Sequence, residues 1–251
     1  MNDKKDKSKI LILIPAYNEE ENIGTFLESL NNSEIAKEAD ILVIDDASKD
    51  RTAEIARGCG VKVISQIYNM GYGAALQLGY KYATKHQYDY VLQLDADGQH
   101  DACNLDIIYE CLTNSQKDCD IIIGSRFLEG SETYKMGAIR ILSIKFFRFI
   151  IKCVCHVNIT DPTSGLQGLS RRAFSYYAQY GKFDYRYPDI NMIIQMLLCG
   201  FHIGECRACM HQRVAGTSMH SGIWKPFAYM ILMSLSTVAA IIRNRKSNSM
   251  G

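Results

Sequence analysis

The first half of this 251-residue sequence alternates between short apolar runs and longer segments with helical periodicity. The apolar runs are rich in Ile, Val and Leu and occupy residues 10–14, 41–44, 61–64, 90–94 and 120–124. The segments between them, in which apolar residues recur at helical spacing, are residues 19–32, 50–58, 72–86 and 104–114. Short strands buried on both faces and joined by helices are typical of parallel sheets. The alternation therefore predicts an α/β fold with a mostly parallel central sheet flanked by helices.

The second half is less regular. Residues 137–157 are apolar and basic, and their cations recur at intervals that favour one face of an amphipathic helix. These cations are Arg140, Lys145, Arg148 and Lys152. Beyond this segment we expect a turn, a strand, a helix and a strand, at residues 161–165, 166–170, 189–200 and 201–208.

The C-terminal residues 223–251 are the most apolar part of the chain. Residues 226–242 carry no charge, and basic residues follow them. An uncharged run of this length is at the lower limit for crossing a bilayer, which takes about 20 apolar residues. We therefore expect a folded domain at residues 1–222 and an apolar, basic-ended helix at residues 223–251. This helix is expected to contact a membrane interface or a partner, and packing on the core or in a dimer interface is the alternative.

Charge and cysteine usage narrow the class of protein. The formal net charge of +1 gives no basic excess of the kind that binds nucleic acid, so no nucleic-acid partner is expected. Residues 1–9 are charged and lead into the first strand without an apolar leader segment. The nine cysteines have no regular spacing and are interpreted as reduced thiols. These features predict a cytoplasmic protein.

Polar residues follow each predicted strand of the first half. In open α/β sheets, ligands bind outside the carboxyl ends of the strands, so these residues are expected to meet at one edge. They are residues 15–20 (PAYNEE), 45–50 (DDASKD), 69–75 (NMGYGAA), 95–101 (DADGQHD) and 124–127 (GSRF). Together they supply carboxylates for a cation, an aromatic ring for a base or ribose, and cations for phosphate.

The most informative of these segments is the one with Asp95 and Asp97. Two carboxylates so close in sequence repel each other unless a positive charge lies between them. A divalent cation is the simplest candidate, because Mg²⁺ and Mn²⁺ prefer carboxylate, amide and phosphate oxygens. The pair therefore predicts a metal site at the end of the fourth strand.

Seven motifs in chain order carry a resemblance to a known family. They are PAYNEE, VIDDASKDRT, N-x-G-x-G-A, LDADGQH, IGSR, DPTSG and R-x-x-G-x-S, and they extend over about residues 9–220. In this order they resemble the inverting family-2 glycosyltransferases of GT-A fold. Among these enzymes, the chain is most similar to the dolichol- and polyprenyl-phosphate sugar synthase branch. The membrane domain of the longer relatives has no counterpart beyond the short apolar tail.

The resemblance implies a nucleotide pocket beside a metal site. The residues it assigns to the pocket are Pro15, Tyr17, Glu19, Asp46, Asp95 and Ser218. Asp46 is expected to contact the base, and Ser218 belongs to a loop that closes over the diphosphate. The metal, Mg²⁺ or Mn²⁺, is assigned to Asp95, Asp97 and Gln99.

The resemblance also implies which residues act in catalysis, namely Asp97, Asp161, Arg126 and Arg213. Asp97 is expected to bridge metal and diphosphate, and Arg126 and Arg213 to hold phosphate. Asp161, in DPTSG, is expected to face the reaction centre.

The expected activity is transfer of one sugar from a GDP- or UDP-linked donor to a polyprenyl phosphate, with inversion at the anomeric carbon. Transfer to a saccharide or lipid-linked hydroxyl in cell-envelope polysaccharide assembly is the alternative, and an inactive nucleotide-sugar binding subunit is a third. A hydroxyl acceptor needs a general base, for which Asp161 is the only well-placed candidate, whereas a phosphate needs none. The DPTSG motif favours phosphate. Because a polyprenyl acceptor lies in a bilayer, we expect peripheral contact with the cytoplasmic membrane face or with a small membrane partner protein. A homodimer is also possible.

Overall fold

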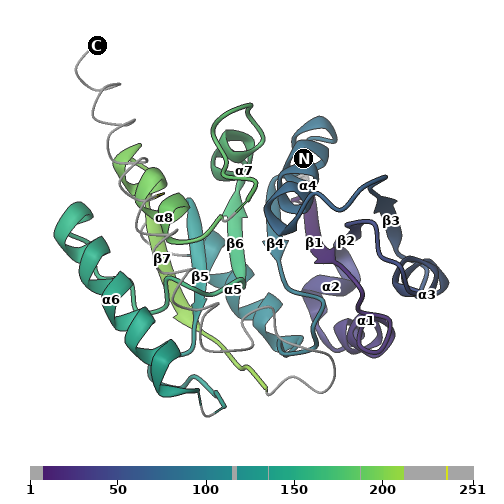
Figure 1. The fold of residues 1–251 in the computed structure, drawn as a ribbon, viewed down its shortest axis with the longest axis horizontal. Coiled ribbons are helices and arrows are strands. Elements are labelled where there is room, and N and C mark those ends of the chain that lie inside the picture. The colour runs from purple at the N-terminus through teal and green to yellow at the C-terminus, as the bar shows by residue number, and fades with distance from the viewer. Residues whose placement is uncertain (1–7, 115–117, 135, 187, 212–235, 237–251) are drawn as a thin grey trace, which may run out of the picture.

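A single seven-stranded sheet forms the centre of the described structure (Figure 1). The computed structural model describes residues 8–114, 118–134, 136–186, 188–211 and 236. The strand order is β3-β2-β1-β4-β6-β5-β7, and neighbours are parallel except where β6 pairs antiparallel with β4 and β5. The strands are β1 (Ile10–Ala16), β2 (Asp40–Asp45), β3 (Lys62–Ser65), β4 (Tyr90–Gln93), β5 (Ile121–Ser125), β6 (Gln167–Ser170) and β7 (Ile203–Arg207). The predicted mostly parallel sheet is confirmed.

Helices cover both faces of this sheet. One face packs against α4 (Tyr72–Lys85), α6 (Ala138–Cys155), α7 (Arg171–Tyr177) and α8 (Ile190–Leu198). The other face packs against α1 (Ile23–Ser29), the short 3-10 helix η1 (Leu30–Asn32), α2 (Glu34–Glu38), α3 (Thr52–Gly58) and α5 (Cys103–Asn114). The result is a three-layer α/β/α arrangement (Figure 1).

The continuous apolar strands explain why both faces need a cover. Every residue of β1 is buried, and successive side chains point to opposite faces. Leu11 and Leu13 belong to the core cluster under α4, whereas Ile12 and Ile14 belong to the cluster under α1 and α5. Full burial of a Leu or Ile side chain contributes roughly 1.5–3 kcal/mol, so this central strand stabilises both halves of the core.

The first helix begins later than its periodicity predicts. The sequence predicts a helix over residues 19–32, but α1 starts at Ile23 and the last turn is the 3-10 segment η1. The N–H groups of Glu19 and Glu20 donate to side chains of the segment after β2. The first N–H groups of a helical segment have no partner within the helix, so these bonds tie the start of the segment to the connection between β2 and α3.

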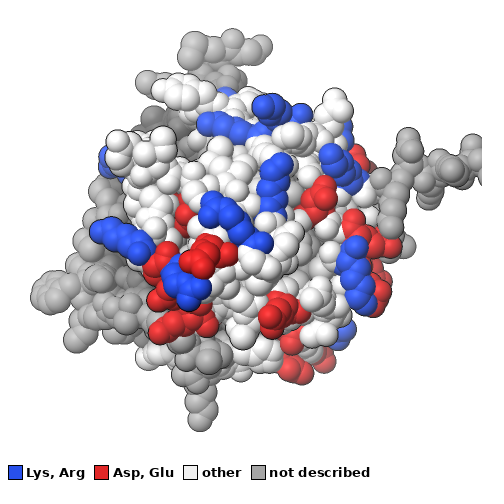
Figure 2. Space-filling model, turned by 90° about the vertical axis from the view of Figure 1, so that its right-hand side faces the viewer, with Lys and Arg blue, Asp and Glu red and all other residues white. Residues whose placement is uncertain are grey.

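The helix α6 lies at the outer edge of the molecule, beyond β7, and packs against α8 (Figure 1). Within the described residues, no helix combines the length and the hydropathy that crossing a bilayer requires. The apolar segment 223–251 lies outside the described residues, so the domain boundary at residue 222 stays a prediction. On the face at the β3 and α3 edge, acidic and basic side chains are intermingled, in keeping with the net charge of +1 (Figure 2).

Candidate active site

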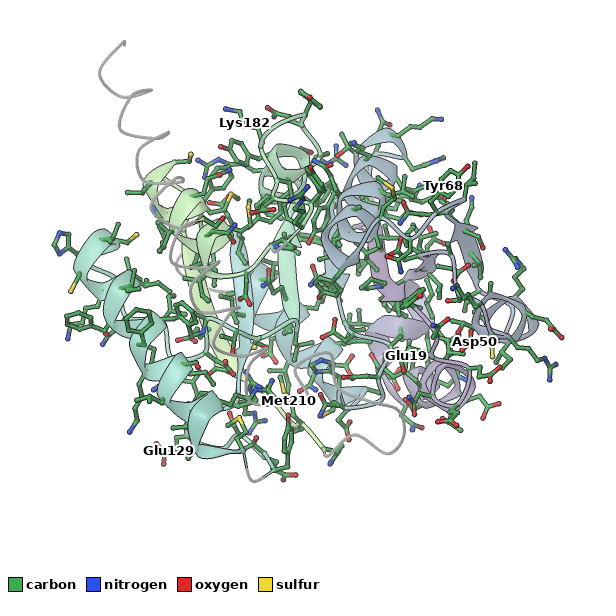
Figure 3. All side chains as sticks on the ribbon, viewed as in Figure 1. Glu19, Asp50, Tyr68, Glu129, Lys182 and Met210 are labelled. Carbon is green, nitrogen blue, oxygen red and sulfur yellow. The ribbon has the colours of Figure 1, made fainter. Side chains whose placement is uncertain are left out.

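The segments that follow β1, β2, β4 and β5 lie at one edge of the sheet, because these four strands run in the same direction. The reversed strand β6 begins at this edge, so the turn 161–165 before it lies there as well. Figure 3 shows Glu19 and Met210 toward this edge and Lys182 at the opposite end of the molecule. The fold thus gathers the polar segments that the sequence places after its strands.

The turn after β4 carries Asp97 and Gln99. Oδ1 of Asp97 accepts a hydrogen bond from the backbone N–H of Gln99 at 3.1 Å, and Gly98 between them has a φ of +69°. This left-handed conformation suits glycine because it has no Cβ. The carbonyl of Gln99 accepts from the N–H of His211 at 2.8 Å. The turn is therefore fixed both internally and by the segment after β7.

Asp95 lies between the first residue of α4 and the turn before β6. Its Oδ1 accepts a hydrogen bond from the Tyr72 hydroxyl at 2.8 Å. Burial raises the pKa of Tyr72 well above its usual value, and the Asp95 carboxylate adds to this. Gly165 packs so closely that a Cβ there would overlap Oδ2 of Asp95. The Asp95 carboxylate thus has a defined place, with contacts from two other segments of the chain.

Asp46 is buried and accepts three hydrogen bonds from the connection between β3 and α4. The donors are Nε2 of Gln66 at 2.9 Å and the backbone N–H groups of Met70 and Gly71, both at 2.8 Å. A carboxylate offers about four lone-pair sites, so these bonds use most of them. Asp46 therefore organises this connection, and its expected contact with a base stays a prediction.

The segments after β1 and β2 are hydrogen-bonded to each other. The N–H of Glu19 donates to Oγ1 of Thr52 at 2.8 Å, and the N–H of Glu20 donates to Oδ2 of Asp50 at 3.1 Å. Figure 3 shows Glu19 and Asp50 on these neighbouring segments. Tyr17, which precedes them, is 41% exposed at the same edge. An exposed aromatic ring on a rigid support is available to a ligand.

Pro15 sits in a central strand without breaking the sheet. It lies opposite Ile44 of β2, whereas the pairing of β1 with β4 ends at Leu13. The missing N–H of proline therefore removes no hydrogen bond toward β4. Pro15 is buried at the carboxyl end of β1, next to the segment that carries Tyr17.

Arg126 and Asp161 form a buried ion pair. Nε and Nη2 of Arg126 donate to the two oxygens of Asp161 at 2.6 and 2.7 Å, and the Arg126 backbone N–H donates to Oδ2 at 3.1 Å. Burial alone would lower the pKa of Arg126, but its hydrogen bonds with Asp161 outweigh this and hold the pKa above its ordinary value. The two residues, each expected to contact the substrate, thus bind each other.

Glu205 of β7 binds the backbone at Asp161 and so holds this pair in place. Its carboxylate accepts from the N–H groups of Thr160 and Asp161 at 2.7 and 2.8 Å and from the Thr160 hydroxyl at 2.9 Å. Sequence reasoning missed Glu205 and also Tyr72 and Gln93. The available signal was a polar residue within a predicted buried strand for Glu205 and Gln93. The only sequence signal for Tyr72 was its position directly after Gly71, at the start of a predicted helix.

Two expected site residues, Arg213 and Ser218, lie outside the described residues. Their assignment to a loop over the diphosphate stays a prediction.

The residues at the end of β4 fit a hard divalent cation. Asp95, Asp97 and Gln99 offer carboxylate and amide oxygens, which Mg²⁺ and Mn²⁺ prefer. His100 lies beside them, with Nε2 3.8 Å from Oδ2 of Asp95 and with Nδ1 buried and without a hydrogen-bond partner. Across the described ranges, no three His, Cys, Asp or Glu side chains are grouped as a metal site. Beyond Asp95, Asp97 and Gln99, further ligands would have to come from substrate or solvent.

Comparison with known proteins defines the class first by fold. The solved structures that match include glucosyl-3-phosphoglycerate synthase from Mycobacterium tuberculosis, crystallised with Mn²⁺, UDP-glucose and phosphoglyceric acid. It aligns with a TM-score of 0.64 at 17% identity, over 94% of this chain and 79% of that chain. At this identity the likeness concerns the fold alone, which is the expected GT-A fold of nucleotide-diphospho-sugar transferases.

Sequence comparison then defines the family. The model of the family described as Glycosyl transferase family 2 matches residues 11–177, and the chain belongs to this family. An uncharacterized protein from Methanocaldococcus jannaschii is 35% identical over 173 residues, covering 69% of this chain and 67% of the relative. An undecaprenyl-phosphate mannosyltransferase from Micrococcus luteus is 28% identical over 222 residues, covering 85% and 88%. A dolichol-phosphate mannosyltransferase from Pyrococcus furiosus is 31% identical over 169 residues, covering 65% of this chain and 46% of the relative.

The buried ion pair leads to a stability prediction. Asp161→Ala leaves the Arg126 guanidinium buried and unpaired, which is expected to lower the free energy of unfolding by about 3–5 kcal/mol. The double variant Arg126→Met/Asp161→Leu is expected to recover most of this loss, because neither charge of the pair then remains buried without its partner. Urea unfolding followed by circular dichroism measures both.

The exposed pair of Arg51 and Glu54 provides the control, since both side chains are 67% exposed. Glu54→Ala is expected to leave the unfolding midpoint nearly unchanged. A loss for Asp161→Ala as small as that for Glu54→Ala would contradict the structural importance of the buried pair.

Proposed function

We propose that this chain transfers a sugar from a nucleoside-diphosphate sugar to a polyprenyl phosphate, with inversion at the anomeric carbon. Membership of the family and the names of the relatives support this proposal. Those relatives are an undecaprenyl-phosphate mannosyltransferase, a polyprenol monophosphomannose synthase, a dolichol-phosphate mannosyltransferase and dolichyl-phosphate glucosyltransferases.

The observation that carries the choice of acceptor is the engagement of Asp161. A hydroxyl acceptor must lose its proton to a base, whereas a phosphate monoester is anionic near neutral pH and needs none. Asp161 was the well-placed candidate base, but its two oxygens accept three hydrogen bonds from Arg126. Little lone-pair capacity is left to receive a proton from a substrate. This favours a phosphate over a hydroxyl acceptor.

In the proposed reaction an oxygen of the acceptor phosphate bonds to the anomeric carbon. The bond between that carbon and the diphosphate oxygen breaks, and the nucleoside diphosphate leaves with both bonding electrons. Attack opposite the leaving group inverts the anomeric configuration. Three of the five side-chain N–H groups of Arg126 are donated to Asp161 and Thr163, and the guanidinium also interacts with Tyr134. The proposed phosphate contact is therefore left to the remaining capacity of Nη1.

The proposed divalent cation is held by Asp95, Asp97 and Gln99. Such a cation stabilises the negative charge that develops on a diphosphate leaving group. Asp46, Pro15, Tyr17 and Glu19 are proposed to line the donor pocket, with Asp46 at the base.

The acceptor proposal predicts a clear preference among substrates. The full chain, given GDP- or UDP-linked sugars and Mn²⁺, is expected to glycosylate undecaprenyl phosphate and not undecaprenol. The lipid product is separated and identified by mass spectrometry. Transfer to undecaprenol or to a free saccharide, without transfer to the phosphate, would show that the hydroxyl alternative is right.

The metal proposal predicts that Asp97→Ala removes nearly all turnover while the fold persists. The expected loss is at least about 10²-fold, the range seen when one electrostatic group at a developing charge is removed. Circular dichroism checks the fold. Glu54→Ala is the control and is expected to keep normal turnover, because Glu54 is 67% exposed on α3, outside the turn after β4. Near-normal turnover of Asp97→Ala would exclude the assignment.

A polyprenyl acceptor requires access to a membrane surface, and α6 is proposed to provide it. Leu142 and Phe149 are each 65% exposed and Phe146 is 40% exposed, on a helix without Asp or Glu. Lys145 and Lys152 are also exposed, beside this apolar stripe. An apolar stripe flanked by lysines is typical of helices that lie in the interface of anionic membranes.

The four cations expected on α6 differ in their exposure and contacts. The guanidinium of Arg148 stacks over the Phe127 ring at 4.3 Å, and Nη1 of Arg140 donates to the Tyr134 hydroxyl at 3.0 Å. Arg148 is therefore directed toward Phe127 and only partly exposed, whereas Arg140, Lys145 and Lys152 are exposed. The proposed site of contact is the cytoplasmic face of the membrane, where the nucleotide sugar is available.

The α6 proposal predicts weaker vesicle binding when the apolar stripe is removed. Leu142→Ser/Phe149→Ser is expected to lower partition onto phosphatidylserine-containing vesicles by about 10-fold or more, since each side chain contributes roughly 1.5–3 kcal/mol when buried. Co-sedimentation measures it. Tyr180→Ser is the control, because Tyr180 is 100% exposed but lies outside α6. Equal loss in both variants, or no loss in either, would contradict the role of α6.

A further inference from the structure

Behind Asp95 lies a chain of hydrogen bonds that the expected metal site does not include. The Tyr80 hydroxyl donates to Oε1 of Gln93, and Nε2 of Gln93 donates to the Tyr72 hydroxyl oxygen at 3.2 Å. The Tyr72 hydroxyl in turn donates to Oδ1 of Asp95 at 2.8 Å. Two residues of α4 and one of β4 thus lead from the core to the candidate metal ligand.

The donor-to-acceptor direction of these hydrogen bonds is fixed at their buried end, by Tyr80 and Gln93. Tyr80 and Gln93 are 1% and 3% exposed, so their polar atoms need partners inside the protein. Nε2 of Gln93 also donates to the carbonyl of Gly165 at 2.9 Å, which holds the amide in one orientation. The Tyr72 oxygen therefore receives a hydrogen bond from Gln93, and its single proton points to Asp95.

The other side of the Asp95 carboxylate is closed by the turn before β6. A Cβ on Gly165 would overlap Oδ2 of Asp95 and lie 3.1 Å from its Cγ. Only glycine leaves room for the carboxylate at this point. Gln93 links the two sides, because it bonds both the Tyr72 hydroxyl and the Gly165 carbonyl.

We propose that Tyr72 is a positioning residue for the divalent cation, acting through Asp95. Its hydroxyl, oriented by Gln93 and Tyr80, fixes Oδ1 of Asp95, while Gly165 limits the position of Oδ2. The Asp95 carboxylate is thereby held in place before the cation binds, so cation binding requires little further ordering of this side chain. This inference rests on the proposed metal site at Asp95 and Asp97.

Tyr72→Phe tests the inference, since it removes one hydroxyl and keeps the ring. Mn²⁺ is titrated into the full chain, alone and with UDP or GDP, and free Mn²⁺ is followed by electron paramagnetic resonance. Loss of a group that orients a metal ligand typically weakens affinity 10- to 100-fold, and about 10-fold or more is expected here. Turnover of Tyr72→Phe should rise toward the wild-type value at high Mn²⁺, because a positioning defect is compensated by mass action and structural damage is not.

Tyr88→Phe is the matched control. The Tyr88 hydroxyl also donates to an aspartate, Oδ2 of Asp40 at 2.6 Å, but at the opposite ends of the strands. Tyr88→Phe is expected to leave the affinity for Mn²⁺ unchanged. Tyr72→Phe and Tyr88→Phe should show similar melting temperatures without metal. Equal Mn²⁺ affinity of wild type and Tyr72→Phe overturns the positioning role alone. Absence of Mn²⁺ binding by the wild-type chain in every condition overturns both this inference and the proposed metal site.

Discussion

The candidate active site, at the edge of the sheet where β4 and β5 end, depends on the reversed direction of strand β6. It lies between β4 and β5 and runs against both, so the chain has to enter it from the edge where those strands end. The turn 161–165 is thereby placed between two loops. Asp161 reaches Arg126 after β5, and Gly165 packs on Asp95 after β4. A parallel strand in this position would carry the turn to the far edge, and neither contact would form.

Hydrophobic periodicity predicted the sheet and the longer helices because burial on both faces requires continuous apolar strands. The limits of this reasoning appear where distant segments meet. Glu19 and Glu20 lie just before α1, and their N–H groups bind Thr52 and Asp50, which are distant in the sequence. These contacts depend on tertiary packing and are invisible to a local pattern. The helix α7 was missed for a different reason, because its capping residue Ser170, which accepts from the N–H of Ala173, is a local signal that was not used.

The composition of the site was easier to predict than its pairing. Motif order identified Arg126 and Asp161 as functional candidates, and parallel strands explain why they share an edge. That they bind each other follows from side-chain direction in the folded state, where an isolated buried charge would be too costly. Tyr72 was missed for a related reason, because its hydroxyl reaches Asp95 only through the packing of α4 on the sheet.

The position of α6 places the proposed membrane contact near the candidate active site. The chain passes from Arg126 at the active edge to Ala138, the first residue of α6, within a short connection. Figure 3 shows Glu129 of this connection near the end of α6 that lies toward the active edge. A lipid surface against Leu142 and Phe149 would therefore be close to the loop that carries Arg126. A long polyprenyl chain could stay in the bilayer while only its phosphate enters the site.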